Sequence, residues 1–149
     1  MFAILFSALT TTPSSGVSVG LVLGDPTGIS LKFWGVGNGM AFQLHAGGGG
    51  FISPATIAFS GSLLFHTALT RQTPLNGYLG VGAYVGMHTR KYDSDYGVMG
   101  LQMPLGLEFI FSEAPLDIFM EIPPIFYITT DGNMGFGLSM GIGLRFILR

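Results

Sequence analysis

The chain has 149 residues, of which 48% are hydrophobic and 9% charged, and it carries a formal net charge of −2 with no cysteine. Soluble domains contain roughly 25% charged residues, so this composition argues against an ordinary water-covered surface. The 24 glycines and the lack of any apolar run of about 18 residues exclude membrane helices. The scattered charges give no sign of nucleic-acid binding, and the lack of cysteine excludes disulfides and thiolate zinc sites.

The N-terminal residues, MFAILFSALTTTPSSG, form a short apolar core from Phe2 to Leu9 followed by small polar residues. This arrangement resembles a secretory signal whose basic first region is missing. We therefore expect residues 1–15 to be a signal peptide or leader. Residues 16–149 are expected to be one β-barrel domain that makes up the whole mature protein.

From Gly16 onward, large apolar residues alternate with small or polar ones, which is the pattern of β-strands. The turn DPTG (25–28) joins the first two runs as a hairpin, because Pro presets φ and Gly accepts positive φ. The alternation predicts eight strands, over residues 17–24, 29–34, 40–45, 57–66, 78–88, 99–111, 117–122 and 136–146.

The two faces of these strands differ strongly. One face is uniformly large and apolar, whereas the other is small, rich in glycine and sparsely charged. A glycine-rich face fits the interior of a narrow closed barrel, and the apolar face then contacts lipid. The pattern predicts an all-β fold, an eight-stranded antiparallel up-and-down transmembrane β-barrel. A soluble eight-stranded barrel or sandwich is the alternative.

Seven links connect the expected strands, and with the N-terminus in the periplasm the first, third, fifth and seventh face outside. Three of these four are among the longer links. The fourth link, TALTRQTPLNG (67–77), would be an unusually long periplasmic turn.

Several motifs resemble a family of small bacterial outer-membrane β-barrel proteins. They are GVSVGLVLGDPTGISLKFW (16–34), SLLFH (62–66), GLQMPLGLEFIFSEAPLDIFMEIPP (100–124) and MGIGLRF (140–146). The resemblance covers nearly all of residues 16–146, and APLD with its following Glu is its most specific part. It implies an architecture like the eight-stranded domain of OmpA and OmpX, with no assigned enzymatic activity. The chain departs from many outer-membrane strands by ending in FILR rather than in an aromatic residue.

Four charged residues at mid-strand positions fall on the inward face: Lys32, Glu108, Glu121 and Arg145. An uncompensated charge in a dry lumen costs several kcal/mol, so these groups are expected to pair as a structural ion network. We expect Lys32 and Arg145 to balance the two glutamates. A proton path or a small channel is the alternative.

Three further hypotheses, two enzymatic and one of a metal site, have less support than the structural ion network. A glycosidase pair of Glu108 and Glu121 would need a cleft for a sugar, which a plugged barrel lacks. His45, His66 and His88 also face inward, but their strand positions argue against a zinc site. A lipid hydrolase needs Ser and His within reach, and Ser60, Ser62 and His66 come nearest. We expect no catalytic residues, no metal and no cofactor.

The link TRKYDSDYG (89–97) combines mixed charge with two tyrosines. It is read as a solvated loop or as a contact surface for a protein or glycan. Trp34, Tyr78 and Tyr127 lie near strand ends and are expected at the membrane interface, although Trp34 has inward parity. The possible contact residues are Arg90, Lys91, Tyr92, Asp93, Asp95 and Tyr96.

Together these features predict a small integral protein of the bacterial outer membrane with a plugged lumen, not an enzyme. It would act as a structural or interaction component through its loops or its lipid-facing wall. Its expected partners are outer-membrane lipid and another membrane protein or membrane complex, with no nucleic acid. A narrow pore is the first alternative, and an outer-membrane lipid-modifying enzyme is the second.

Overall fold

The computed structural model describes residues 12–24, 26–49, 57–70, 72–89 and 95–148. These residues form eleven β-strands and contain no helix long and apolar enough to cross a membrane. The strands are β1 (Gly16–Gly24), β2 (Thr27–Gly37), β3 (Met40–Gly48), β4 (Ile57–Ala68), β5 (Leu75–His88), β6 (Tyr96–Gln102), β7 (Leu105–Ile110), β8 (Leu116–Ile122), β9 (Pro124–Thr129), β10 (Met134–Leu138) and β11 (Gly141–Leu148).

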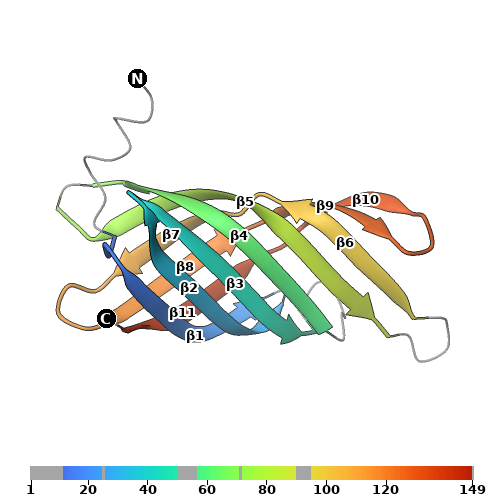
Figure 1. Cartoon of the computed structure of the whole chain (residues 1–149), viewed down its shortest axis with the longest axis horizontal. Helices are drawn as coiled ribbons and strands as arrows, with labels where there is room; N and C mark the ends of the chain where they lie inside the picture. The colour runs from blue at the N-terminus through green and yellow to red at the C-terminus, as the bar shows by residue number, and fades with distance from the viewer. Residues whose placement is uncertain (1–11, 25, 50–56, 71, 90–94, 149) are drawn as a thin grey trace, which may run out of the picture.

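Eight of these strands close into a barrel. The order β5-β4-β3-β2-β1-β11-β8-β7 is completed by pairing of β7 with β5, and every pairing is antiparallel. Figure 1 shows the strands wrapping obliquely around a single long axis. The prediction of an all-β closed barrel with eight strands is therefore confirmed.

The remaining strands each continue one barrel strand past a local break: β6 continues β7, β9 continues β8 and β10 continues β11. Gln102 pairs with Ile125 in β6–β9, and Leu105 pairs with Ile122 in β7–β8, so the register is unchanged across the gap. Pro104 has no N–H for the ladder, and the same holds for Pro123. The sequence predicted single strands at 99–111 and 136–146, which the structure resolves into β6 with β7 and β10 with β11.

The strands are strongly staggered. The stagger can be measured by stepping from each residue to its paired residue on the next strand, once around the barrel. A path that starts at Leu144 of β11 returns to the same strand line at Met134 of β10, which is 144 − 134 = 10 residues away. The residues on this path are Leu144, Leu21, Ile29, Ala46, Phe59, Val85, Met99, Ile128 and Met134. A stagger of this size in eight strands corresponds to a tilt of about 40°.

The stagger gives the barrel two different ends. β1 begins and β11 ends at one of them, which we call the terminal end. The opposite end, the hairpin end, carries the β1–β2, β5–β6 and β9–β10 connections. Figure 1 shows β5, β6, β9 and β10 reaching farther at the hairpin end than β1 and β2.

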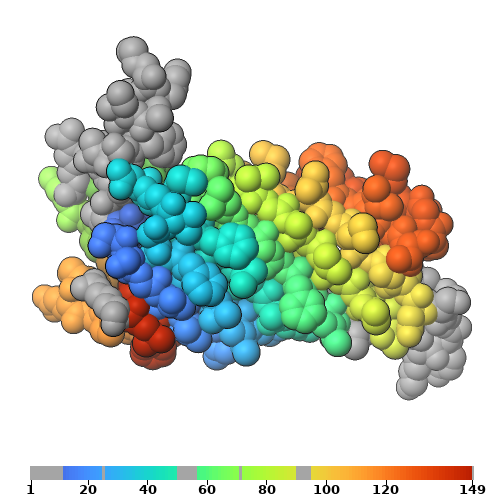
Figure 2. Space-filling view, in the orientation of Figure 1, coloured from blue at the N-terminus to red at the C-terminus, as the bar shows by residue number. Residues whose placement is uncertain are grey.

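The outward side chains are large and apolar, and the space-filling view shows them as packed rows along the strands (Figure 2). Leu101 is 67% exposed and Phe126 is 61% exposed. The inward side chains alternate with them and are mostly buried, including Lys32, Glu108 and Arg145 at 0% exposure. The barrel thus has apolar side chains on its outer surface and charged side chains in its interior.

Two expectations about local structure were wrong. The link expected at residues 67–77 spans only 69–74, because β4 runs to Ala68 and β5 begins at Leu75. Trp34, Tyr78 and Tyr127 were expected at the membrane interface, but all three point inward: Trp34 and Tyr78 are buried, and Tyr127 is half-buried against the inner apolar cluster. Their inward parity outweighs the general preference of aromatic residues for strand ends.

Candidate functional site

Arg145 lies at the centre of the polar lumen. It sits on β11 directly opposite Asp117 of β8, so the two side chains share the inward face of neighbouring strands. Its Nε donates to Asp117 Oδ1 at 2.9 Å and its Nη2 donates to Glu108 Oε1 at 2.6 Å. Its Nη1 donates to Gln43 Oε1 at 2.7 Å and to Ser30 Oγ at 3.3 Å. One guanidinium therefore ties together side chains from four other strands.

Lys32 approaches the same carboxylate from β2. Its Nζ donates to Glu108 Oε1 at 2.5 Å and lies 2.9 Å from Nε2 of His66. His66 Nε2 is 3.3 Å from the second carboxylate oxygen, Glu108 Oε2. Glu108 Oε1 thus accepts hydrogen bonds from both Lys32 and Arg145, whereas His66 lies beside Oε2, and all four side chains are completely buried.

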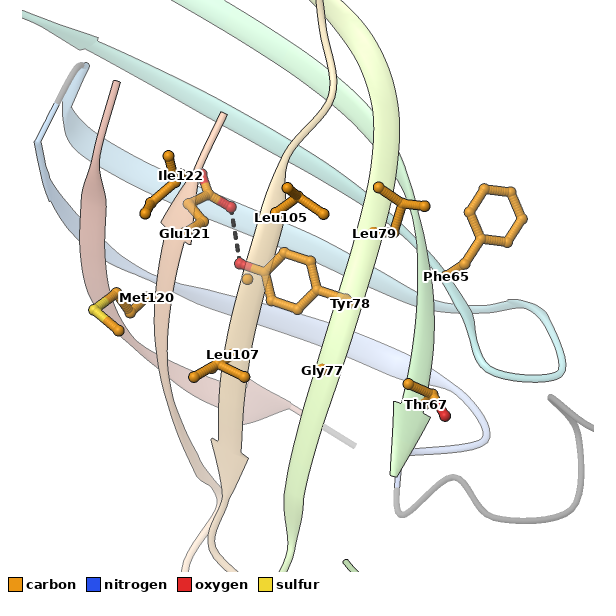
Figure 3. A pocket seen from close by; sticks show the side chains of 11 residues that line it. Phe65, Thr67, Gly77, Tyr78, Leu79, Leu105, Leu107, Met120, Glu121 and Ile122 are labelled. Atoms are coloured by element: carbon orange, nitrogen blue, oxygen red, sulfur yellow. Dashed lines mark hydrogen bonds between the residues drawn. The ribbon is translucent and has the colours of Figure 1, made fainter. Parts of the chain in front are cut away.

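Glu121 occupies a separate branch of the network. Its Oε2 accepts hydrogen bonds from Gln43 Nε2 at 2.9 Å and from the Tyr78 hydroxyl at 2.8 Å. Its Oε1 lies 3.3 Å from Nδ1 of His45. Figure 3 shows Tyr78 and Glu121 reaching toward one another across β7. Gln43 links this branch to Arg145, because its two amide atoms bond to Glu121 and to Arg145.

Glycine at position 106 makes the Tyr78 contact possible. A Cβ built at Gly106 would stand 2.2 Å from Cζ of Tyr78, so the ring needs the space that the glycine leaves. Aromatic rings also cover the cations. Lys32 Nζ is 4.0 Å from the Trp34 ring centroid, and Cζ of Arg145 is 3.9 Å from that of Phe119.

Apolar clusters close the lumen on both sides of the network. Trp34, Ala41, Ile110 and Ile147 form the seal toward the terminal end. Trp34 is fixed there by a 2.7 Å bond from Nε1 to Ser18 Oγ. The seal toward the hairpin end consists of Ala58, Tyr84, Val98 and Ile125. The charges therefore lie in a compartment bounded by apolar side chains.

The formal charges of the network do not cancel. Lys32 and Arg145 contribute two positive charges, whereas Glu108, Asp117 and Glu121 contribute three negative ones. Glu121 is the carboxylate held by neutral donors, Gln43 and Tyr78, and by a histidine. A buried carboxylate can be tolerated when several hydrogen bonds satisfy its oxygens.

The structure brings Lys32, Glu108 and Arg145 of the predicted set into direct contact, whereas Glu121 contacts neither cation in the bonds described above. Asp117 shares the inward parity of Glu121 in the alternating sequence, but it was not among the four residues predicted to form the network. Its role depends on which residue of β11 lies opposite it, which periodicity alone does not give. Alternation also marked Gln43, Tyr78, His45 and His66 as inward, but not as partners.

The residues considered for catalysis have other partners here. Ser62 Oγ accepts a hydrogen bond from Gln102 Nε2 at 2.7 Å, and His66 bonds within the ion network. His88 lies at the hairpin end, where its ring stacks on Tyr96 with centroids 4.8 Å apart.

The predicted loop contact set is only partly described. Asp95 is exposed, and Tyr96 is half-buried at the start of β6 rather than in the loop. The other four residues, Arg90, Lys91, Tyr92 and Asp93, lie outside the described residues, as do residues 1–11 of the expected leader.

The outer wall carries a shallow apolar groove of about 440 Å³ beside the Tyr78–Glu121 pair. It forms where β5 presents the outward glycine Gly77. Figure 3 shows Leu79, Leu105 and Leu107 around it, together with Phe65 and Met120. Thr67, Tyr78 and Glu121 also line this groove, but most of its lining is apolar, so it offers contact area to an apolar chain.

Fold and site together define a closed antiparallel β-barrel with a buried, charged side-chain network. No protein-family model, curated protein or solved structure matches the chain. The likeness to small outer-membrane barrels therefore rests on the quoted sequence motifs and on the architecture.

Proposed function

We propose that the protein is an integral β-barrel of the bacterial outer membrane with a sealed lumen. It acts as a structural or interaction component and neither conducts solutes nor catalyses a reaction. The observation that carries this proposal is the inside-out distribution of side chains, with apolar residues exposed on the wall and charges buried in the lumen.

The height of the apolar wall supports a membrane location. Along β6 and β7 the outward positions run from Met99 to Phe111 and are all large and apolar. Thirteen residues at about 3.3 Å each, tilted by about 40°, span on the order of 30 Å, which matches a bilayer core. In water the same wall would be an aggregation surface far larger than monomeric proteins expose.

The closure of the barrel also supports a membrane location. Each of the eight barrel strands has a neighbour on both sides, so the backbone N–H and C=O groups of this closed section are paired without water. Only helices and closed barrels meet this requirement inside a bilayer. The short 69–74 and 111–115 links at the terminal end fit a periplasmic side, and the longer 89–95 link fits the outside.

The sealed network argues against a pore. A conducting path would need water along the lumen, whereas Lys32, His66, Glu108, Asp117 and Arg145 have no exposed side-chain surface. Burying such charges stabilises little by itself, but it fixes which side chains face one another. We infer that the network sets the register and rigidity of the barrel, and that lipid or another membrane protein is met by the wall and the hairpin-end loops.

Two measurements test the proposal. The full chain refolded into lipid vesicles should float with them and resist extraction by alkaline carbonate, and in planar bilayers it should give no stable conductance steps. Conductance steps that disappear in a Glu121→Gln variant would replace the sealed barrel with a pore. Turnover of phospholipid or lipid A by the purified protein would contradict the non-enzymatic assignment.

A further inference from the structure

Among the residues that the structure describes, the barrel wall is incomplete at the hairpin end. β1 stops at Gly24, opposite Gly141 of β11, whereas β10 continues onward to Met134. Among the described strands, β10 pairs only with β9. The seven residues from Gly141 back to Met134 correspond to about 23 Å of strand without a neighbour on that side. Figure 1 shows β9 and β10 extending beyond the ends of β1 and β2.

This gap exposes the inner face of the projecting sheet. A pocket of about 420 Å³ lies there, within the range typical of small-molecule sites. Its floor is apolar and includes Tyr84, Val98 and Ile125, which form the hairpin-end seal above the ion network. The lumen below this floor is filled, so the pocket is a blind cup and not the mouth of a channel.

The rim of the cup is polar. Thr129, Asp131 and Asn133 line it from the β9–β10 turn. Side-chain hydrogen bonds close this turn: the Thr129 hydroxyl donates to Asp131 Oδ1 and accepts from the Asn133 N–H at 3.1 Å. The lining therefore combines the apolar floor with this hydrogen-bonding rim, and the buried polar side chains of His88 and Ser139 also line the pocket.

One glycine of β10 keeps the cup open. Gly137 faces inward, is half-exposed and lines the pocket. A Cβ at Gly137 would meet only Cε1 of Tyr127, at 3.7 Å, so the position has room for a side chain that is not there. At Gly135 the space is already taken by the Tyr127 ring, whose Cζ would stand 2.6 Å from an added Cβ. A larger residue at position 137 would therefore fill the cup.

We propose that the cup binds an outer-leaflet lipid, with one alkyl chain on the apolar floor and the polar head at the rim formed by Thr129, Asp131 and Asn133. The opening lies beside Met134, Phe136 and Leu138, whose outward side chains are all more than half exposed and apolar. Given the membrane location proposed above, on which this inference rests, the gap opens sideways toward lipid.

The edge of β10 also favours a lipid over a water-filled gap. Asn133 and Ser139 bond to β9 through their backbones, so the alternating ladder turns the N–H and C=O groups of Met134, Phe136 and Leu138 toward the gap. Such groups are costly to leave in hydrocarbon, and the polar head of a lipid can supply partners there. A second copy is a poor occupant, because antiparallel pairing of two β10 edges would place the two barrels upside down relative to each other.

The test uses the full chain in dodecylphosphocholine micelles, with methyl-labelled Ile, Val and Leu, and records NOEs to the dodecyl chain. The inward methyl groups of Ile125 and Val98 should give clear NOEs. Ile147, buried in the terminal-end seal, should give none, and Ile128, exposed on the outer wall of β9, should give strong ones.

The possible outcomes separate the two proposals. If Ile125 behaves like Ile147 while Ile128 gives NOEs, the cup does not hold an alkyl chain and the inference is overturned. If Ile128 is also silent, the lipid-facing wall itself is refuted. Chemical-shift changes at Ile125 with phosphocholine alone, equal to those with the detergent, would assign the site to a head group and overturn the alkyl assignment.

A matched pair of variants locates the effect. Gly137→Leu should fill the cup and abolish the NOEs of Ile125, whereas Phe136→Leu, one residue away on the opposite face of β10, should preserve them. Loss of the NOEs in both variants, or in neither, contradicts the proposed position. The wild-type comparison of Ile125 with Ile147 decides the question even if the Gly137→Leu chain does not refold.

Discussion

Replacing Arg145 with methionine removes the central cation of the lumen while keeping an unbranched side chain. Asp117 then loses its 2.9 Å partner, whereas Glu108 keeps Lys32. Removing one member of a buried ion pair costs about 3–5 kcal/mol, because the other charge stays buried without compensation. We therefore expect Arg145→Met to lower the free energy of unfolding by about 4 kcal/mol.

Urea unfolding in lipid vesicles measures this cost. Trp34 is the only tryptophan of the chain and lies buried beside the network, so its fluorescence reports the lumen directly. With an m value of about 2 kcal/mol/M, the midpoint should fall by about 2 M urea. Glu113→Gln, at an exposed site in the 111–115 link, is the control and should leave the midpoint unchanged.

A second substitution tests the cause. In the Arg145→Met background, Asp117→Asn removes the stranded charge and should recover about 1–3 kcal/mol. If the double variant is less stable than Arg145→Met alone, or if Arg145→Met unfolds at the wild-type midpoint, then uncompensated charge does not govern the stability of the lumen.

Three further predictions concern packing, burial and charge. Gly106→Val should lower the free energy of unfolding by about 1–3 kcal/mol, because the added side chain displaces the Tyr78 ring. The fraction of chain that keeps the heat-dependent gel mobility of a folded barrel measures this loss. Wild-type mobility and stability would refute the close contact. Trp34 fluorescence should resist acrylamide when folded, and unfolded-like quenching would contradict its burial. The Thr129 hydroxyl holds the pKa of Asp131 below its usual value, so Thr129→Val should raise that pKa in an NMR titration; an unchanged pKa would refute the bond.

The sequence predicted the barrel well because its main signal is local. Alternation with period two assigns each side chain to one face without knowledge of the rest of the fold. It placed Lys32, Glu108 and Arg145 inside, and the structure buries all three. The breaks within the strands were harder to predict from the sequence, because Pro104 interrupts a ladder whose register continues unchanged on either side.

Partner choice could not be derived in the same way. It depends on the stagger between strands, which sets Arg145 opposite Asp117 and leaves Glu121 opposite Gly141. A change of register by two residues would preserve every face assignment and place Arg145 opposite Phe119 or Pro115 instead of Asp117. The long link expected at 67–77 failed for a similar reason, since the last residues of β4 are fixed by pairing across strands, with Thr67 opposite Gly77 and Ala68 opposite Asn76.

The most direct test of the membrane-barrel proposal is spin-label accessibility in lipid vesicles. The chain contains no cysteine, so single-cysteine variants can be labelled without background. Labels at the outward positions Leu101, Leu107 and Met120 should relax with oxygen, which dissolves in lipid, and not with a water-soluble nickel complex. Labels at the inward positions Ser62 and Gln102 should respond weakly to both. Outward labels that respond mainly to the nickel complex would place the apolar wall in water and contradict the account.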